Sequence, residues 1–247
     1  MEWFENWFET KYYHILYSNR TEGEAESFIE KLYEHLKLSP GKRVLDLACG
    51  RGRHSRKLAA MGCSVTGADI SKNSIDFARQ FEKENLNFIV HDMRKPTGLR
   101  FDAVVNLFTS FGYFEDENDN NRVISAIHED LKKNGLFVLD FLNPGYVAQN
   151  LVPTERKKIK GFTFDISRSI ENGVIIKEIT VHDPEKDTEK TYYEKVTAFE
   201  KKHIVQMLEN NGLSVQYIHG DYNLNEYDPR RSERMIFTAE KAAPQSN

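Results

Sequence analysis

The feature that most constrains the fold is an alternation of short apolar runs with helical apolar patterns over about the first 140 residues. Runs such as 43–48 and 136–142 are mainly apolar, whereas Phe28, Leu32 and Leu36 recur every four residues, as on a buried helix face. Strands that alternate with helices and read as apolar runs form a parallel sheet covered on both faces. Right-handed crossovers then predict a doubly wound α/β fold with a mostly parallel sheet.

Local signals indicate where individual helices begin and end. Ser71 precedes a segment with helical periodicity and is expected to cap its amino end. A further helix is predicted at about 118–132, and Gly135 is expected to stop it, because glycine adopts the left-handed conformation that often ends helices.

The pattern changes to a period of two after Pro144. Apolar and polar residues alternate over 162–167, Asn172-Gly173 is a two-residue hairpin signal, and Asp183-Pro184 begins a second turn. We therefore predict an antiparallel ribbon or small sheet over 157–199. A helix at 200–210 and strands at 213–220 and 233–240 then complete a seven-stranded main sheet. The predicted organisation is an N-terminal segment at 1–24, a main domain at 25–150 and 200–241, a small antiparallel β insert at 151–199, and a disordered tail at 242–247.

Composition excludes several classes of protein. The 247 residues include 34 Lys and Arg against 38 Asp and Glu, a net charge of −4, which disfavours a nucleic-acid partner. No run approaches the ~20 apolar residues of a membrane span. The first ten residues lack the basic start of a signal peptide. Two cysteines form no disulfide framework or cysteine-based zinc site by themselves. We expect a cytoplasmic protein with no metal, and a monomer or a homodimer.

A glycine pair between the first strand and the following helix indicates a nucleoside-like ligand. Gly50-Arg51-Gly52 lies where a dinucleotide-binding loop would lie, but position 55, where the third glycine is needed, is Ser. Asp46 precedes the glycines and would repel a pyrophosphate. A carboxylate there suits a ligand that carries a cationic amino group and no phosphate.

The segment from Val44 to Gly52 resembles the first motif of class I S-adenosylmethionine (SAM)-dependent methyltransferases, with Ala48 in place of the usual first glycine. Segment 65–69 resembles the second motif, and segment 91–93 the third, on the adenine side. The resemblance covers residues 40–143 well and continues more loosely to the end of the chain. It implies a Rossmann-like fold, SAM as the cofactor and transfer of a methyl group.

The resemblance also implies a set of cofactor-binding residues. Glycine lets the backbone approach the methionine part of SAM without a clash from a Cβ atom. Asp46 is expected to bind the α-amino group, directly or through water, and Asp69 the ribose hydroxyls. Asp92 is expected to accept from the adenine amine, and Ile70 to pack on the adenine. The expected cofactor-binding residues are Asp46, Ala48, Gly50, Gly52, Asp69, Ile70, Asp92, Met93, Asn106, Phe108, Tyr17 and Arg20.

Segment 106–113 follows the fourth strand, and in the family it borders the sulfonium and the methyl acceptor. It lacks the Asn/Asp-Pro-Pro-Tyr of many DNA and protein amide methyltransferases. Aromatic rings there attract a cation by ~0.5–2 kcal/mol. Transfer from a sulfonium needs little chemistry from the protein, so no catalytic residue is assigned. Candidate substrate contacts are Phe111, Tyr113, Tyr192 and Asp221.

The N-terminal segment is rich in aromatic residues and ends near Arg20. In small-molecule members of the family such a segment folds over the cofactor, and Tyr13, Tyr17 and Arg20 are candidates for the methionine carboxylate. For Trp3 to Phe8 we favour a helix that packs on the sheet or on another subunit. The insert resembles a β element that covers the substrate in glycine/sarcosine-type enzymes. Lys177 and Glu194 are a candidate cross-strand pair.

These observations favour a SAM-dependent methyltransferase that acts on a small molecule. The alternatives are an RNA or protein methyltransferase, a non-catalytic SAM-binding protein and an NAD-dependent oxidoreductase. The sequence does not identify the methyl acceptor.

Overall fold

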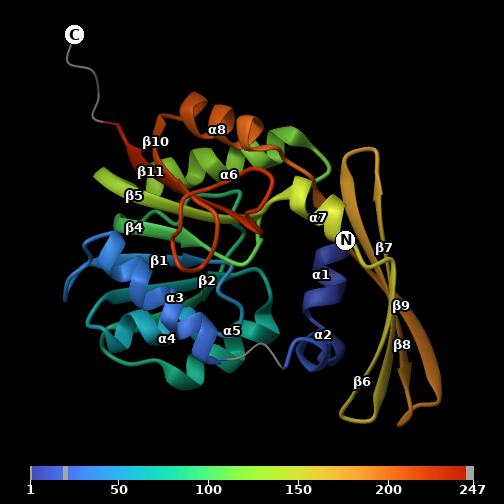
Figure 1. Ribbon diagram of the computed structural model, residues 1–247. Helices are drawn as coiled ribbons and strands as arrows, with labels where there is room; N and C mark the ends of the chain where they lie inside the picture. The colour runs from blue at the N-terminus through green and yellow to red at the C-terminus, as the bar shows by residue number, and fades with distance from the viewer. Residues whose placement is uncertain (1, 19–21, 243–247) are drawn as a thin grey trace.

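The computed structural model describes residues 2–18 and 22–242, which form two separate sheets (Figure 1). The larger sheet has seven strands in the order β10-β11-β5-β4-β1-β2-β3. Its five parallel strands are β1 (Arg43–Leu47), β2 (Ser64–Asp69), β3 (Leu86–Val90), β4 (Phe101–Asn106) and β5 (Leu131–Leu142). β11 (Arg234–Lys241) lies antiparallel between β5 and β10 (Leu213–His219). The predicted doubly wound, mostly parallel sheet is confirmed.

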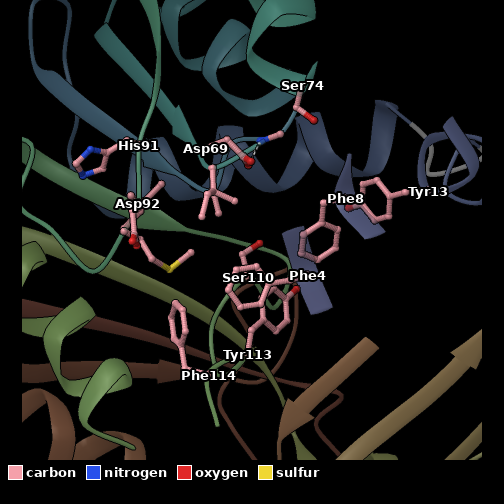
Figure 2. Close-up of a pocket in the computed structure, with 15 residues that line it drawn as sticks. Phe4, Phe8, Tyr13, Asp69, Ser74, His91, Asp92, Ser110, Tyr113 and Phe114 are labelled. Atoms are coloured by element: carbon pink, nitrogen blue, oxygen red, sulfur yellow. Dashed lines mark hydrogen bonds between the residues drawn. The ribbon is translucent and has the colours of Figure 1, made fainter. Parts of the chain in front are cut away.

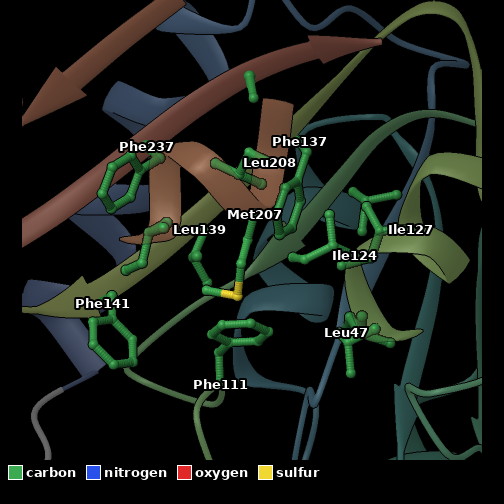
Figure 3. Close-up of a cluster of buried hydrophobic side chains, with 14 of the residues drawn as sticks. Leu47, Phe111, Ile124, Ile127, Phe137, Leu139, Phe141, Met207, Leu208 and Phe237 are labelled. Atoms are coloured by element: carbon green, nitrogen blue, oxygen red, sulfur yellow. The ribbon is translucent and has the colours of Figure 1, made fainter. Parts of the chain in front are cut away.

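Helices cover both faces of this sheet, as Figure 1 shows. One face carries α3 (Glu22–His35), α4 (Arg53–Ala60), α5 (Lys72–Ala78) and the short 3₁₀ helix η1 (Arg79–Phe81). The other carries α6 (Glu117–Asp130) and α8 (Lys201–Asn210). Successive strand residues alternate between the two cores: Val44 and Val65 pack toward α4, and Leu45 packs toward α6. Figure 3 shows the core on the face covered by α6 and α8, where side chains of β5, α6 and α8 meet around Phe111 and Met207.

The local signals are partly confirmed. Ser71 caps α5, because its Oγ accepts a hydrogen bond from the Ser74 amide at 3.1 Å. The end of α6 differs from the prediction, since the helix ends at Asp130 and Gly135 lies inside β5. Leu131 is extended (φ −76°, ψ 139°) and pairs with Phe101. A buried leucine fits helical spacing and strand spacing equally well, so the pattern alone did not place this boundary.

The smaller sheet is antiparallel and contains β6 (Thr154–Ile159), β7 (Phe162–Glu171), β8 (Val174–Asp183) and β9 (Thr188–Thr197). Asn172 and Gly173 have φ values of 50° and 75° and form the predicted tight turn between β7 and β8. Lys160 and Gly161 make a similar turn, with φ values of 50° and 86°. This turn was not predicted, because β6 is mostly charged, and neither was the helix α7 (Pro144–Asn150).

Two short helices, α1 (Trp3–Phe8) and α2 (Lys11–Leu16), lie between the two sheets (Figure 1). Trp7, Tyr12 and Leu16 form a third core with the inner face of the small sheet, including Phe164. The Tyr12 hydroxyl also donates to the buried Asp183 carboxylate at 2.6 Å. The N-terminal helices are therefore joined to the small sheet. No helix in the described ranges, 2–18 and 22–242, has the length and apolar character needed to cross a membrane.

Candidate functional site

A pocket of about 700 Å³, counted with its open mouth, lies at the carboxyl ends of β1, β2, β3 and β4, next to α1 (Figure 2). Ligands of open α/β sheets bind at this edge, where the strand order reverses. The residues that line it are Phe4, Phe8, Tyr13, Leu47, Ala48, Gly50, Asp69, Ile70, Ser74, His91, Asp92, Met93, Ser110, Tyr113 and Phe114. The pocket therefore joins residues of all three sequence motifs to aromatic residues of the N-terminal helices.

The two glycines of the loop after β1 have different environments. Gly50 has φ 55°, and a Cβ atom added to it would meet no other atom within 4 Å. Its backbone therefore faces the open pocket. Gly52 has φ 75°, but a Cβ atom there would lie 2.5 Å from the ring of Phe88. Gly52 does not line the pocket, and its missing side chain lets α4 pack against β3.

Asp46 lies beneath this loop and does not line the pocket. Its side chain is buried and accepts a hydrogen bond from the Ser55 hydroxyl at 2.5 Å. Burial raises the pKa of Asp46 to about 7, although the Ser55 hydrogen bond favours the ionised form. Ser55 is the residue that stands where a dinucleotide-binding loop has its third glycine. Its hydroxyl gives the buried Asp46 carboxylate a hydrogen-bond partner inside the protein.

Asp69 ends β2 at the centre of the pocket (Figure 2). The Gly50 amide donates to its Oδ2 atom and the Ser71 amide to its Oδ1 atom, both at 2.8 Å. Burial raises its pKa, and these two amides oppose the rise. Because a carboxylate accepts about four hydrogen bonds, Asp69 can also accept from ligand hydroxyls. The two amides fix the direction in which its oxygen atoms point.

Asp92 lies on the other side of the pocket, after β3 (Figure 2). It accepts from Arg94 through Nε at 3.0 Å and Nη2 at 2.9 Å, and Arg94 also contacts Asp119 at 2.9 Å. Burial favours the protonated form, but the Arg94 hydrogen bonds outweigh it and lower the pKa of Asp92. Among the described lining residues are two carboxylates and no Lys or Arg. This charge pattern suits a cationic or uncharged ligand better than a phosphate.

Aromatic residues line the end of the pocket near β4 (Figure 2). Ser110, Tyr113 and Phe114 come from the segment after β4, and the Tyr113 hydroxyl donates to the Thr109 carbonyl at 2.5 Å. Tyr13 also lines the pocket. Phe4 and Phe8, expected to pack on the sheet or on another subunit, line it as well. Their spacing of four residues, about one turn of a helix, is a signal that could have placed them on a shared face, but the prediction did not use it.

Several predicted residues lie outside this pocket. Phe108 stacks on His54 at 4.8 Å between ring centroids. Asn106 is buried and donates to the Leu47 carbonyl at 3.1 Å, so it braces the loop after β1. Phe111 is buried in the core of the main sheet.

Other predicted residues belong to the surroundings of the small sheet or to a surface turn. Tyr192 packs on Trp7 at 4.9 Å between ring centroids. Asp221 accepts from Asn225 in a turn after β10. Tyr17 donates to Glu194 at 2.6 Å, and Arg20 lies outside the described residues, as does almost all of the predicted disordered tail.

Glu194 is the centre of a polar cluster between the N-terminal helices and the small sheet. It lies directly opposite Lys177, whose Nζ atom is 3.2 Å from its carboxylate, which confirms the expected cross-strand pair. Trp7 donates to it through Nε1 at 2.8 Å, and Tyr17 donates through its hydroxyl. No group of three or more metal-ligating side chains occurs in the part of the chain that the structure describes.

Comparisons with known proteins agree with this geometry. Residues 44–135 match a family model described as a methyltransferase domain. The glycine/sarcosine N-methyltransferase of Aphanothece halophytica is 34% identical over 145 residues, which cover 56% of this chain and 52% of that protein. The dTDP-3-amino-3,6-dideoxy-alpha-D-glucopyranose N,N-dimethyltransferase of Streptomyces fradiae is 27% identical over 189 residues, 72% of each chain. The chain spans about half the length of the first curated relatives it matches.

The fold of nearly the whole chain is similar to that of solved structures. A SAM-dependent methyltransferase from Clostridium acetobutylicum superposes with a TM-score of 0.79 at 18% identity, over 94% of this chain and 96% of that one. A SAM-bound amino pentose methyltransferase from Micromonospora echinaspora gives a TM-score of 0.70 at 20% identity, over 94% and 98%. Residues 44–135 therefore match a methyltransferase domain, and the fold of nearly the whole chain is that of solved SAM-dependent methyltransferases.

Proposed function

We propose that this protein is an enzyme that transfers a methyl group from SAM to a small-molecule acceptor. The observation that carries the proposal is the composition of the pocket. Ala48 and Gly50 after β1, Asp69 and Ile70 after β2, and Asp92 and Met93 after β3 line one pocket although they come from three separate segments.

The residues present fit SAM. The open space at Gly50 admits close approach of a ligand to the backbone. Asp69 would hold the ribose hydroxyls, Asp92 would accept from the adenine amine, and Ile70 would pack against the adenine ring. Two acidic side chains and several aromatic rings suit a positively charged sulfonium. Asp46 is sealed beneath the loop, so we expect it to reach the α-amino group only through water or a shift of the loop.

SAM supplies a methyl group on positively charged sulfur, with a neutral leaving group. This chain would bind SAM and the methyl acceptor, orient them and exclude water from the pocket. The rings of Phe4, Phe8 and Tyr113 provide an apolar wall at the end of the pocket near β4. Holding the two reactants in line in a water-poor pocket supplies most of the gain in such a reaction. A general base is needed only if the acceptor must lose a proton early.

A small acceptor is favoured by what surrounds the pocket. The N-terminal helices lie over it and are joined to the small sheet, so we propose that these elements together form a roof over the site. A closed roof leaves room for a small molecule more readily than for a nucleic acid or a folded protein. The relatives named as acting on glycine, sarcosine and an amino sugar support the same class of acceptor.

The test is incubation of the protein with methyl-labelled SAM and a metabolite extract, followed by mass spectrometry. We expect label in a small molecule with the wild-type protein and none with Asp69→Ala. SAM binding without any labelled product would favour the non-catalytic SAM-binding protein. Label confined to RNA or protein would favour the macromolecular alternative.

A further inference from the structure

An ion pair between a fully buried carboxylate and a partly buried arginine lies beneath the segment that follows β4. Asp140 on β5 has no exposed surface, and its Oδ1 atom accepts a hydrogen bond from Arg234 Nε on β11 at 2.8 Å and lies 2.7 Å from Arg234 Nη2. Arg234 also lies over the ring of Tyr222, 5.6 Å from its centroid. Neither member of the pair lines the pocket.

The pair forms hydrogen bonds with two residues of this segment, Phe108 and Thr109. The Phe108 amide donates to Asp140 Oδ2 at 2.7 Å, and the Thr109 amide donates to the Asp140 carbonyl at 3.0 Å. Arg234 Nη2 donates to the Thr109 hydroxyl at 2.7 Å. The pair therefore holds the segment through one side chain and two backbone amides.

Those two residues have a backbone conformation that they would not adopt unaided. Phe108 has φ 60° and Thr109 has φ 59°, in the left-handed region that residues with a Cβ atom rarely enter. Two consecutive residues of this kind persist only where their surroundings hold them. Asp140 and Arg234 supply the hydrogen bonds that do so.

The conformation of this segment determines where the pocket wall lies. Ser110, Tyr113 and Phe114 follow within five residues of Thr109 and line the pocket. The Tyr113 hydroxyl donates back to the Thr109 carbonyl, and Trp3 of α1 donates to the Tyr113 carbonyl at 3.4 Å. A shift of Thr109 would thus move both the wall and the docking of α1.

We propose that Asp140 and Arg234 are positioning residues, which act through Phe108 and Thr109 to set the part of the pocket wall that Ser110 and Tyr113 form. This inference rests on the proposed function. In the proposed complex this wall would face the methionine half of SAM, whereas the residues after β2 and β3 would hold the adenosine half. Loss of the pair should therefore weaken the binding of SAM and leave the binding of adenosine alone intact.

The experiment compares Asp140→Asn and Arg234→Lys with a matched control, Asp102→Asn. Asp102 lies at the other end of β4, where it accepts from the Arg43 amide at 2.8 Å and from Lys132 at 2.8 Å. It is thus a similar carboxylate network far from the pocket. Calorimetry measures the affinity of each protein for SAM and, separately, for adenosine. Tryptophan emission gives a second readout, because the chain has two tryptophans and both lie in α1.

For both test variants we expect the affinity for SAM to fall at least tenfold, about 1.4 kcal/mol, with less than a twofold change for adenosine. Tryptophan emission should shift to the red, and adding Thr109→Gly to Asp140→Asn should restore part of the affinity, because glycine adopts a positive φ without strain. The control should show none of these changes.

Equal losses for SAM and adenosine, or wild-type SAM affinity in both test variants, would overturn the inference while leaving the proposed function in place. A wild-type protein that binds no SAM would overturn both. If Asp140→Asn does not fold, Arg234→Lys, which keeps the positive charge, decides the question by the same measurements.

Discussion

Replacing Gly52 by alanine should destabilise the fold more than the same change at Gly50, although both glycines have positive φ. A left-handed residue with a Cβ atom costs ~1–2 kcal/mol. At Gly52 the new Cβ atom would also lie 2.5 Å from the Phe88 ring, and overpacking of this kind costs ~1–3 kcal/mol more. The loss of unfolding free energy is therefore about 2–5 kcal/mol for Gly52→Ala and about 1–2 kcal/mol for Gly50→Ala.

The loss of SAM affinity, in contrast, should be larger for Gly50→Ala than for Gly52→Ala. The methyl group of Gly50→Ala would stand in the open space where the ligand approaches the loop, so SAM affinity should fall at least tenfold, about 1.4 kcal/mol. Gly52→Ala places its methyl group against Phe88, outside the pocket, and should lose less affinity for SAM below its unfolding temperature.

Thermal unfolding and calorimetry measure the two effects independently. For a chain of this size a loss of 1 kcal/mol lowers the midpoint by about 2–4 °C, so Gly52→Ala should unfold roughly 4–20 °C below the wild type. A Gly52→Ala protein as stable as the wild type would refute the packing role of Gly52. A Gly50→Ala protein with wild-type affinity would refute the placement of the ligand against the loop.

Two further substitutions test the acidic residues Asp46 and Glu194. Burial raises the pKa of Asp46 to about 7, so folding favours the protonated form, and this contribution to stability is fully present below pH ~4 and lost as the pH rises through 7. Asp46→Asn should thus gain stability relative to the wild type between pH 4 and 7, by up to about 4 kcal/mol, and a difference in urea midpoints that does not vary with pH would contradict this. Glu194→Gln should weaken the hydrogen bonds from Trp7 and Tyr17 and the ion pair with Lys177, and lower the unfolding free energy by ~1–3 kcal/mol. Proteolysis should then cut the N-terminal helices faster, and an unchanged cleavage rate would show that Glu194 does not hold them.

The sequence predicted the main sheet well, because its strands are buried on both faces and its helices have a clear apolar stripe. Errors occurred where a residue fits two patterns. Leu131 suits the end of α6 and the start of β5, and the structure assigns it to β5 because it pairs with Phe101. β6 was missed because a charged edge strand carries no apolar alternation.

The pocket was predicted best where the fold itself places the residues. Asp69 and Asp92 follow parallel strands, whose carboxyl ends share one edge of the sheet, so their order along the chain implied their proximity. Phe4 and Phe8 were not predicted as lining residues because a short aromatic helix has no fixed position relative to the sheet. The ion pair of Asp140 and Arg234 was also missed, since its members are far apart in the chain and sit in strands that read as ordinary core.

Binding of SAM in this pocket is tested by titrating the purified wild-type protein with SAM, with S-adenosylhomocysteine and with NADH in a calorimeter. We predict saturable binding of both adenosyl compounds at micromolar concentration and no binding of NADH, and loss of SAM binding in Asp69→Ala. Absence of heat from both adenosyl compounds, under conditions in which micromolar binding would register, would contradict the assignment of the pocket.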